Sequence, residues 1–351
     1  MNRFSKRRPT IVDIARKLDI SAMTVSRALN GKGEVSKEMR KKVIDCATTL
    51  GYRPNRWARS LVTRRSLMIG VVVPEIAHSF FAEIISGIEE VLEKAGYDIL
   101  LCHSRSDPAR ERAEIQALFE SQVDGLIVAP EQPESDPGPF VDLQKRKIPL
   151  VLVDRFFPGL KLSTVRLDDA AAGWMATDFL IRLGHRRIGH ISGPDVSTGS
   201  LRRRGFLKAL RKHGVAASKE LVVQANFGID EGREAMRKLL QLKPRPTAVF
   251  AANDPQALGA IYVCRDAGFR VPEDISIVGA GNIEGIYHPN PFLTTIDWPR
   301  QELGRVAARI LLRTLEKGDR NPPEVHVFQP KLLIRHSTAP VPADNCKAAP
   351  Q

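Results

Sequence analysis

The sequence of 351 residues is poor in the residues from which metal centres, disulfide frameworks and membrane spans are built. Its four cysteines lie far apart without CxxC spacing, which argues against a zinc site and favours a reducing compartment. The eight histidines include no HExxH pair, so we expect no metal. The longest strongly apolar run, Leu67 to Val73, is far shorter than the roughly 20 residues of a membrane helix. The basic start has no apolar run after it, so we expect neither a secretory signal nor a membrane partner.

Acidic residues are also scarce at the start of the chain. Residues 1–65 hold 17 Lys and Arg but only five Asp and Glu, a net charge of +12 out of +13 for the whole chain. The stretch PNRWARSLVTRRS, residues 54–66, has four arginines and no acid. A basic module joined to a nearly neutral remainder is typical of a protein that binds a polyanion such as nucleic acid. Charge alone leaves a second interpretation open, a solvated basic tail.

Three short amphipathic helices are predicted within residues 10–51. The first begins after a Thr10 cap and the second after a Ser21 cap, and the third runs from Ser36 to Gly51. One face of the second helix is apolar, and its opposite face carries Met23, Ser26, Arg27 and Asn30 at helical spacing. The tight turn between the first two helices matches the helix-turn-helix pattern, in which the second helix enters the major groove. The alternative is a plain three-helix bundle, which the concentration of charge here disfavours.

The motifs of this segment resemble those of the lactose and galactose repressor family of bacterial transcription regulators. Matching positions are Val25-Ser26-Arg27, Asn30, Val35-Ser36, Arg40, Val43, Gly51-Tyr52, Pro54-Asn55, Ala58 and Leu61. The resemblance implies a DNA-binding head at residues 1–53 that reads double-stranded operator DNA, a pseudo-palindrome, as half of a homodimer. It implies DNA contacts from Thr10, Ser21, Ala22, Met23, Thr24, Ser26, Arg27, Asn30, Asn55, Arg56, Ala58, Arg59 and Leu61. Arg27 is the most capable base reader because its planar fork can bond two guanine acceptors at once.

Residues 54–65 connect this head to the remainder. A helix from Asn55 to about Val62 would have roughly two turns, too few to persist alone in water. We therefore expect a hinge helix that folds when its dimer mate and DNA are present. By the resemblance, Leu61 is an apolar wedge in the minor groove, while Arg56 and Arg59 contact phosphates. Trp57 is expected to pack on the core or on its mate.

From Leu67 onward, apolar runs alternate with helical patterns. Strands are predicted at Leu67–Val73, Tyr97–His103, Gly125–Ala129, Leu150–Asp154, Arg187–Ser192, Leu221–Phe227, Ala248–Ala252 and Ile275–Gly279. Helices are predicted at Phe80–Ala95, Pro108–Ser121, Ala171–Leu183, Leu201–His213, Asp230–Leu242 and Pro255–Ala267. This alternation predicts α/β lobes with parallel sheets covered on both faces. Polar pairs such as Asp154-Arg155 and Asn253-Asp254 follow the strands, where such sheets bind ligands, although each alone is equally explained as a cap or ion pair.

The resemblance to the family extends along essentially the whole of this region, for example in Val153-Asp154-Arg155 and Ala252-Asn253-Asp254. It implies a multidomain protein, with an all-α head and a two-lobed core like a periplasmic sugar-binding protein. The implied segments are a core at 66–338, lobe 1 at about 66–165 and 297–325, lobe 2 at about 166–296 and 326–338, crossings near 165, 296 and 326, and a flexible tail at 339–351. A small-molecule effector in the cleft would contact Phe80, Phe81, Arg105, Asp154, Arg202, Phe227, Asn253 and Asn282.

One stretch departs from the family pattern. In VGAGNIEG, residues 278–285, Gly281 stands where the family commonly has a carboxylate that bonds effector hydroxyls. Loss of this acid, while Arg105, Arg155 and Arg202 remain, would make the cleft more positive. Among a sugar, a sugar acid and a phosphosugar, this pattern favours one of the two acidic effectors.

These observations predict a cytoplasmic, sequence-specific transcriptional regulator, a repressor of carbohydrate metabolism genes, held at the nucleoid by its operator. The alternatives are a free-standing solute-binding protein and a carbohydrate-processing enzyme. Neither GxSxG nor a Walker loop is present, and Glu284 breaks a GxGxxG pattern, so we expect neither catalysis nor a cofactor. Asp154 and Asp254 could act as an acid–base pair only across the two lobes. The residues leave open whether the effector releases or promotes DNA binding.

Overall fold

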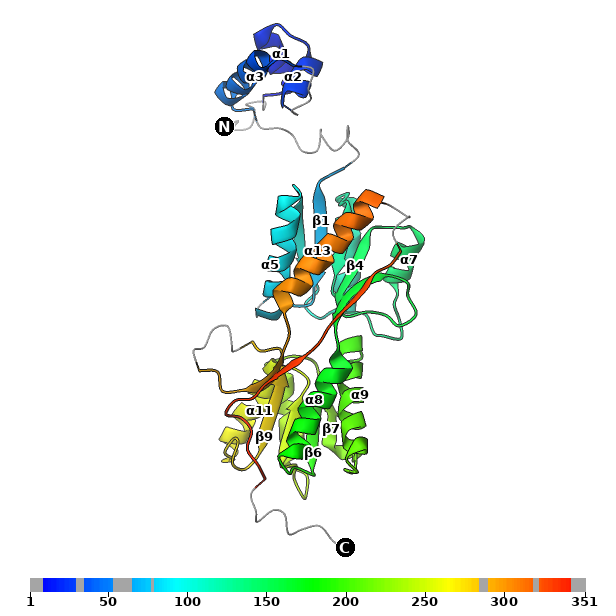
Figure 1. The fold of residues 1–351 in the computed structure, drawn as a ribbon, viewed down its shortest axis with the longest axis vertical. Coiled ribbons are helices and arrows are strands. Elements are labelled where there is room, and N and C mark those ends of the chain that lie inside the picture. Colours follow the sequence, from blue (N-terminus) through cyan, green and yellow to red (C-terminus); the bar gives the residue numbers. More distant parts are fainter. Residues whose placement is uncertain are drawn as a thin grey trace, which may run out of the picture. The chain divides into compact units, whose positions relative to one another are not determined.

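The computed structural model of the protein describes residues 9–29, 35–52, 65–76, 79–283, 290–317 and 322–341. The chain divides into two compact units, Met1–Ser66 and Leu67–Gln351. In the described residues, the first unit has three helices, and the second has two six-stranded sheets with their covering helices (Figure 1).

The first unit is built from α1 (Ile11–Leu18), α2 (Ala22–Leu29) and α3 (Lys37–Leu50). The carboxylate of Asp13 accepts hydrogen bonds of 2.8 Å from both the backbone N–H and the hydroxyl of Thr10 at the start of α1. The Ser21 hydroxyl accepts the N–H of Thr24 at 3.0 Å and so caps α2. Buried apolar side chains from all three helices form a small core: Ile14, Ala15, Val25, Ala28, Val43, Cys46 and Ala47.

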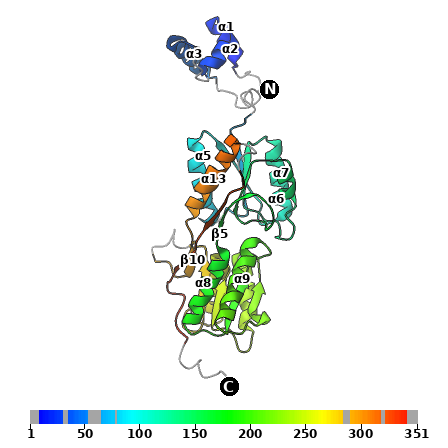
Figure 2. The same cartoon turned by 45° about the vertical axis from the view of Figure 1, so that its right-hand side comes forward.

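Lobe 1 is an all-parallel sheet with the strand order β11-β5-β4-β3-β1-β2. Its strands are β1 (Met68–Val73), β2 (Asp98–His103), β3 (Gly125–Val128), β4 (Leu150–Asp154), β5 (Ser163–Leu167) and β11 (Val325–Phe328). Its helices are α5 (Ser79–Lys94), α6 (Pro108–Glu120), α7 (Pro139–Lys145) and α13 (Arg300–Lys317). Helices α5 and α13 cover one face, and α6 and α7 cover the other (Figures 1 and 2). Alternate residues of β1 accordingly enter two clusters, Val71 with α5 and α13, and Val72 with α6 and α7.

Lobe 2 repeats this plan with the strand order β12-β10-β9-β8-β6-β7, in which only the β10–β12 pair is antiparallel. Its strands are β6 (Ile188–Ser192), β7 (Val222–Gln224), β8 (Ala248–Ala251), β9 (Ser276–Ala280), β10 (Thr294–Asp297) and β12 (Lys331–Leu333). Its helices are α8 (Asp169–Arg182), α9 (Ser197–Lys212), α10 (Ile229–Leu240) and α11 (Asp254–Asp266), with a 3-10 turn at Lys219–Leu221.

The chain passes between the lobes three times, after Leu167, after Asp297 and after Phe328. Each crossing comes one or two residues after its predicted position, near 165, 296 or 326. The third is delayed because Phe328 pairs with Leu167 and completes the β11–β5 register before the chain leaves lobe 1.

The predicted flexible tail also begins later than residue 339. The backbone N–H of Ala339 donates to the Ser276 hydroxyl at 3.0 Å, and that of Val341 donates to the Leu183 carbonyl at 3.0 Å. Residues 339–341 are therefore attached to lobe 2, and residues 342–351 lie outside the described part of the chain.

Helices α5 and α13 cross at unusually short range. A Cβ atom placed on Gly304 of α13 would lie 2.0 Å from the Ile84 carbonyl oxygen, and one on Gly87 of α5 would lie 2.0 Å from the Gln301 carbonyl oxygen. Only glycine permits this approach, so the two helices form a tightly packed pair.

Candidate nucleic-acid interface and ligand cavity

Helix α2 presents one apolar face to the head core and one face to solvent. Val25 and Ala28 are buried, whereas Met23 is 64% exposed and Arg27 is also exposed. Met23 and Arg27 are four residues apart in the helix, so their side chains lie on the same face of α2. The α2 surface therefore combines an apolar contact, at Met23, with a guanidinium that can bond base edges, at Arg27.

The residues predicted to contact DNA fall into two groups. Those that the structure places at the start of α1 and along α2 are Thr10, Ser21, Ala22, Met23, Thr24, Ser26 and Arg27. Those that lie outside the described residues are Asn30, Asn55, Arg56, Ala58, Arg59 and Leu61, together with most of the predicted hinge.

A cavity opens in the core unit where the strands of both sheets reach their carboxyl ends. In each sheet the strand order reverses beside the first strand of the lobe, and loops diverging at such a point leave a crevice. The empty volume here is about 550 Å³, a figure that includes space open to solvent. Its lining residues are Pro74, Glu75, Phe80, Phe81, Ser106, Asp154, Arg155, Thr198, Arg202, Phe227, Asn253, Pro255, Ala280, Gly281 and Ile283.

Asp154 and Arg155 bring two incompletely bonded polar groups to this cavity. Both residues are 4% exposed, and Nε of Arg155 lies 3.7 Å from Oδ2 of Asp154, too far for a hydrogen bond. Neither Oδ1 of Asp154 nor Nε of Arg155 has a hydrogen-bond partner among the described residues. Burial raises the pKa of Asp154 above its ordinary value, because desolvation outweighs the attraction of Arg155 and Arg202. A hydroxyl group, which both donates and accepts, has the hydrogen-bonding capacity that these two atoms lack.

Arg202 and Asn253 also line the cavity, but part of their bonding capacity is already used. Nε of Arg202 donates to Oδ1 of Asp169 at 2.8 Å, and Nη1 donates to the Ala252 carbonyl at 2.6 Å. The Asn253 amide donates to the Phe227 carbonyl at 2.8 Å and accepts from the N–H of Gln256 at 2.9 Å. These contacts fix the two side chains in place, and one Arg202 nitrogen, Nη2, remains outside the hydrogen bonds described.

The cavity does not carry the surplus of positive charge expected from its arginines. Arg155 is ion-paired with Glu131 and Arg202 with Asp169, and two carboxylates, Glu75 and Asp154, line the wall. The argument for an acidic effector is therefore not supported by this geometry, and a neutral, hydroxyl-rich ligand suits it better.

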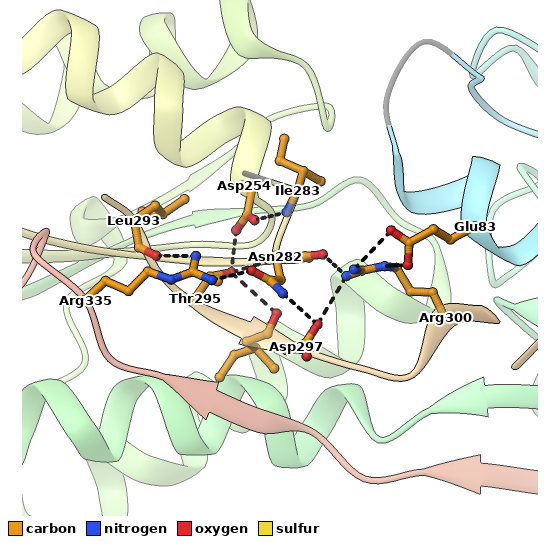
Figure 3. Close-up of polar contacts among 11 residues, drawn as sticks. Glu83, Asp254, Asn282, Ile283, Leu293, Thr295, Asp297, Arg300 and Arg335 are labelled. Carbon is orange, nitrogen blue, oxygen red and sulfur yellow. Dashed lines mark hydrogen bonds and ion pairs between the residues drawn. The ribbon is translucent and has the colours of Figure 1, made fainter. Parts of the chain in front are cut away.

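Two predicted effector residues do not line the cavity. Arg105 is exposed, at a backbone φ of +54°, and its neighbour Ser106 reaches the wall instead. The Asn282 amide donates to Asp297 at 3.1 Å and its oxygen accepts from Arg335 at 2.6 Å (Figure 3). Asn282 thus belongs to a network behind the wall rather than to the wall.

The backbone conformation explains why glycine stands at position 281, where the family commonly has a carboxylate. Gly281 lines the cavity with a φ of +136°, a conformation open only to glycine, so a carboxylate side chain could not replace it without a change in the chain path. The nearest carboxylate, Asp254, accepts from the Thr295 hydroxyl at 2.5 Å and from the Ile283 N–H at 2.9 Å. Asp254 therefore supports the wall, and these bonds do not fit an acid–base role paired with Asp154.

Sequence reasoning missed Glu75 and Thr198 as lining residues. Glu75 comes two residues after the end of β1, so the rule applied to the other strand ends would have found it. Thr198 is the second residue of α9 and is 2% exposed, a position that has no polar signature in the sequence.

Metal and membrane features were sought in the described segments. Within them, no group of three or more His, Cys, Asp and Glu side chains is placed to hold a metal ion. None of the helices described is both long and apolar enough to cross a membrane.

Comparison with known proteins gives consistent matches over nearly the whole chain. Residues 10–55 match the model of bacterial regulatory proteins of the lacI family, and residues 177–338 match the periplasmic binding protein-like domain. The chain is 35% identical over 334 residues to the HTH-type transcriptional repressor CytR of Escherichia coli (strain K12), a match that covers 95% of this chain and 97% of CytR.

Two solved structures illustrate the likeness of fold. One is a transcriptional regulator CelR–cellobiose complex, with a TM-score of 0.71 and 33% identity, covering 94% of this chain and 100% of that one. The other is the Lac repressor dimer bound to operator and the anti-inducer ONPF, with a TM-score of 0.83 and 25% identity, covering 95% and 100%.

Proposed function

This chain belongs to the lacI family of bacterial regulatory proteins, and from that premise we propose that it is a dimeric repressor whose operator affinity is set by a neutral, sugar-like effector. It works in the cytoplasm, where the DNA is, and has no catalytic role. Each chain reads one half-site with α2, and occupancy of the core cavity changes the geometry of the two heads.

The DNA-binding part of the proposal is supported by the charge and by α2. The first 65 residues carry +12 of the net charge of +13, which supplies phosphate attraction. Met23 and Arg27 then give α2 an exposed face with one apolar and one hydrogen-bonding reader. The Lac repressor, a structure similar to this chain, is a dimer bound to operator.

The effector part rests above all on the unpartnered Oδ1 of Asp154. A buried carboxylate oxygen without a donor costs the folded protein free energy, and a ligand donor at the cavity would relieve that cost. Phe80, Phe81 and Phe227 offer ring faces for the apolar side of a sugar. The similar regulator CelR was solved with cellobiose, which makes this disaccharide the first compound to test.

Selection of DNA from a random pool by the full-length protein tests the first part. We expect an enriched pseudo-palindrome whose binding weakens steeply with salt. Equal retention of all sequences would contradict sequence-specific regulation.

Trp298 supplies a signal for the second part. It is 2% exposed, and the Arg202 guanidinium lies 5.0 Å from its ring centroid. In a W57F/W174F double variant Trp298 is the only tryptophan, so its fluorescence can be followed as neutral sugars and their acids are added. We expect a neutral sugar to change the emission and the matching acid to have little effect.

Asp154→Asn is the matched test of the cavity. The amide keeps the shape but removes the anionic acceptor, so sugar affinity should fall by about 1.5–3 kcal/mol, the range for a hydrogen bond to a charged group. Thermal stability should stay level or rise, because a buried charge is removed. Calorimetry that finds sugar affinity unchanged in this variant would exclude Asp154 as a contact.

A further inference from the structure

Arg300 lies at the point where the chain returns from lobe 2 to lobe 1, and its guanidinium is bonded to both lobes. It is 4% exposed and is the first residue of α13. Its Nε and Nη2 donate to the two carboxylate oxygens of Glu83 on α5, at 3.0 and 3.3 Å. Its Nη1 donates to the carbonyl of Gly281 and, at 3.3 Å, to Asp297 at the end of β10. Figure 3 shows the side chain between Glu83 on one side and Asp297 on the other.

The lobe 1 end of this junction leads directly to the cavity. Glu83 lies on α5 within one turn of Phe80 and Phe81, which line the wall and contact each other edge to face. The glycine crossing of α5 and α13 leaves these helices little freedom to slide. A displacement of the two phenylalanines would therefore also displace Glu83.

The lobe 2 end leads to the cavity as well. Gly281 and Ile283 line the wall, and the intervening Asn282 is bonded to Asp297 and to Arg335. The Ile283 N–H is held by Asp254 (Figure 3). These contacts make residues 281–283 a short, fixed piece of wall whose attachment to lobe 1 passes through Arg300.

We propose that Arg300 is a positioning residue that couples the cavity wall at Gly281 to α5, so that occupancy of the cavity is converted into a change of the angle between the lobes. This inference rests on the proposed function and assigns its coupling step to one guanidinium. Arg300 does not line the cavity, so it acts through Gly281, Asp297 and Glu83 rather than on the ligand.

A second ion pair on the same two helices provides the matched control. Arg305 of α13 donates to Glu90 of α5 at 2.7 Å, and its other described partner, Glu302, is also on α13. The Arg305 pair joins α5 to α13 as the Arg300 pair does, but within lobe 1. If the Arg300 variant acted only by weakening the packing of α5 against α13, the Arg305 variant would have a similar effect on the protein.

Amide hydrogen exchange of the full-length protein tests the junction without any ligand. In Arg300→Met and in Glu83→Gln, we expect the amides of Gly281 and Ile283 to exchange about tenfold faster than in the wild type, since their segment opens more readily. Arg305→Met and Glu90→Gln should leave those rates within about twofold. Unchanged rates in the Arg300 and Glu83 variants, or an equal increase in the control pair, would overturn the inference. Glu83→Gln preserves shape at a partly exposed site and serves if Arg300→Met does not fold.

Coupling itself is measured as the ratio of operator affinities without and with saturating cellobiose, using operator selected by the wild-type protein. In Arg300→Met, cellobiose should still bind within about threefold of the wild-type affinity while the ratio falls towards one. A ratio equal to that of the wild type would overturn the inference, as would a proportional loss of cellobiose affinity. A wild-type protein that selects no DNA would contradict the proposed function instead, and the exchange comparison would still decide the role of Arg300.

Discussion

Arg27 is the residue at which base recognition can be tested most directly. Its side chain is exposed on α2, beside Met23 and opposite the buried Val25. Arg27→Ala should cost about 1–3 kcal/mol of operator affinity and relax the preference at one base pair of each half-site. Competition binding against a set of single-base operator variants measures both effects.

Lys41→Ala is the control, because Lys41 is an exposed cation on α3 and not on the proposed reading face. It should weaken binding, if at all, equally for every operator variant. Identical base preferences in the wild type and Arg27→Ala would show that Arg27 reads no base.

The burial of His190 predicts that the stability of lobe 2 depends on pH. Its ring is stacked between Phe206 and Phe250, with centroids 4.7 and 4.9 Å away, and Nδ1 is 2.8 Å from the Phe250 carbonyl oxygen. Burial lowers the pKa of His190 from 6.5 to about 4, because the charged form is desolvated. Between about pH 6.5 and 4, the His190 imidazole is therefore protonated in the unfolded chain but neutral in the folded chain. Stability is lost as the pH falls through this range.

Urea unfolding at pH 7.5 and 4.5 tests this linkage. His190 alone should contribute a loss on the order of 3 kcal/mol once pH reaches about 4, and His190→Phe should lose less stability on acidification than the wild type. Exposed His326→Phe should behave as the wild type does. Equal acid sensitivity in all three proteins would contradict the assignment to His190.

Site residues were only partly predictable, and the errors have physical reasons. Asp154 and Asn253 could be found because polar side chains after buried parallel strands meet at one edge of the sheet. Arg202 lies inside α9 and was named only through the family resemblance. Arg105 and Asn282 follow strands too, yet the Arg105 side chain is exposed away from the cavity wall and Asn282 is bonded to Arg335. Ion pairs such as Arg155–Glu131 join residues far apart in sequence, so the charge balance of the cavity could not be derived from a count of arginines.

At the scale of whole elements, the α5–α13 pair predicts a change in stability opposite to the one expected from helix propensity. Glycine inside an exposed helix normally costs about 1 kcal/mol relative to alanine. At Gly304, however, the added Cβ would meet the Ile84 carbonyl oxygen at 2.0 Å. Gly304→Ala should therefore destabilise the core by about 1–3 kcal/mol or more, the usual cost of overpacking.

Denaturant unfolding of the full-length protein measures this effect. Arg309→Ala, at a half-exposed position of the same helix, should change stability by less than about 1 kcal/mol. A stabilised Gly304→Ala variant would mean that the helices separate at little cost and that their close crossing is not needed.

Elements with a continuous apolar run or a clear helical period were predicted well. Strand β4 was predicted at Leu150–Asp154, its observed bounds, and α6 was placed within one residue at its end. Strands β5, β10, β11 and β12 were not predicted as strands, since they are three to five residues long and several carry polar side chains. Helix α13 was missed although it is amphipathic, and the return of the chain to lobe 1 was implied by the family resemblance rather than by a local pattern. Such crossings depend on pairing between distant segments, which local patterns do not record.

For the whole molecule, the account requires that a conformational change in the core alters the DNA affinity of the head through residues 54–65. Leu61→Ala should weaken operator binding by about 1–3 kcal/mol if its side chain is inserted between base pairs, as the family resemblance implies. Sugar affinity should be unchanged, since Leu61 belongs to the predicted hinge and not to the predicted effector contacts. Operator affinity equal to that of the wild type would exclude the wedge.

The central claim is that one chain links the contents of its cavity to the affinity of its head for DNA. The most direct measurement is the operator dissociation constant of the full-length protein, by fluorescence anisotropy, across a titration of the sugar that alters Trp298 emission. We predict a shift of about 5–150-fold, the usual span of allosteric coupling, reached at sugar concentrations that saturate the cavity. In Asp154→Asn the same shift should require a higher concentration. Saturation of the cavity with no change in the operator dissociation constant would contradict the account.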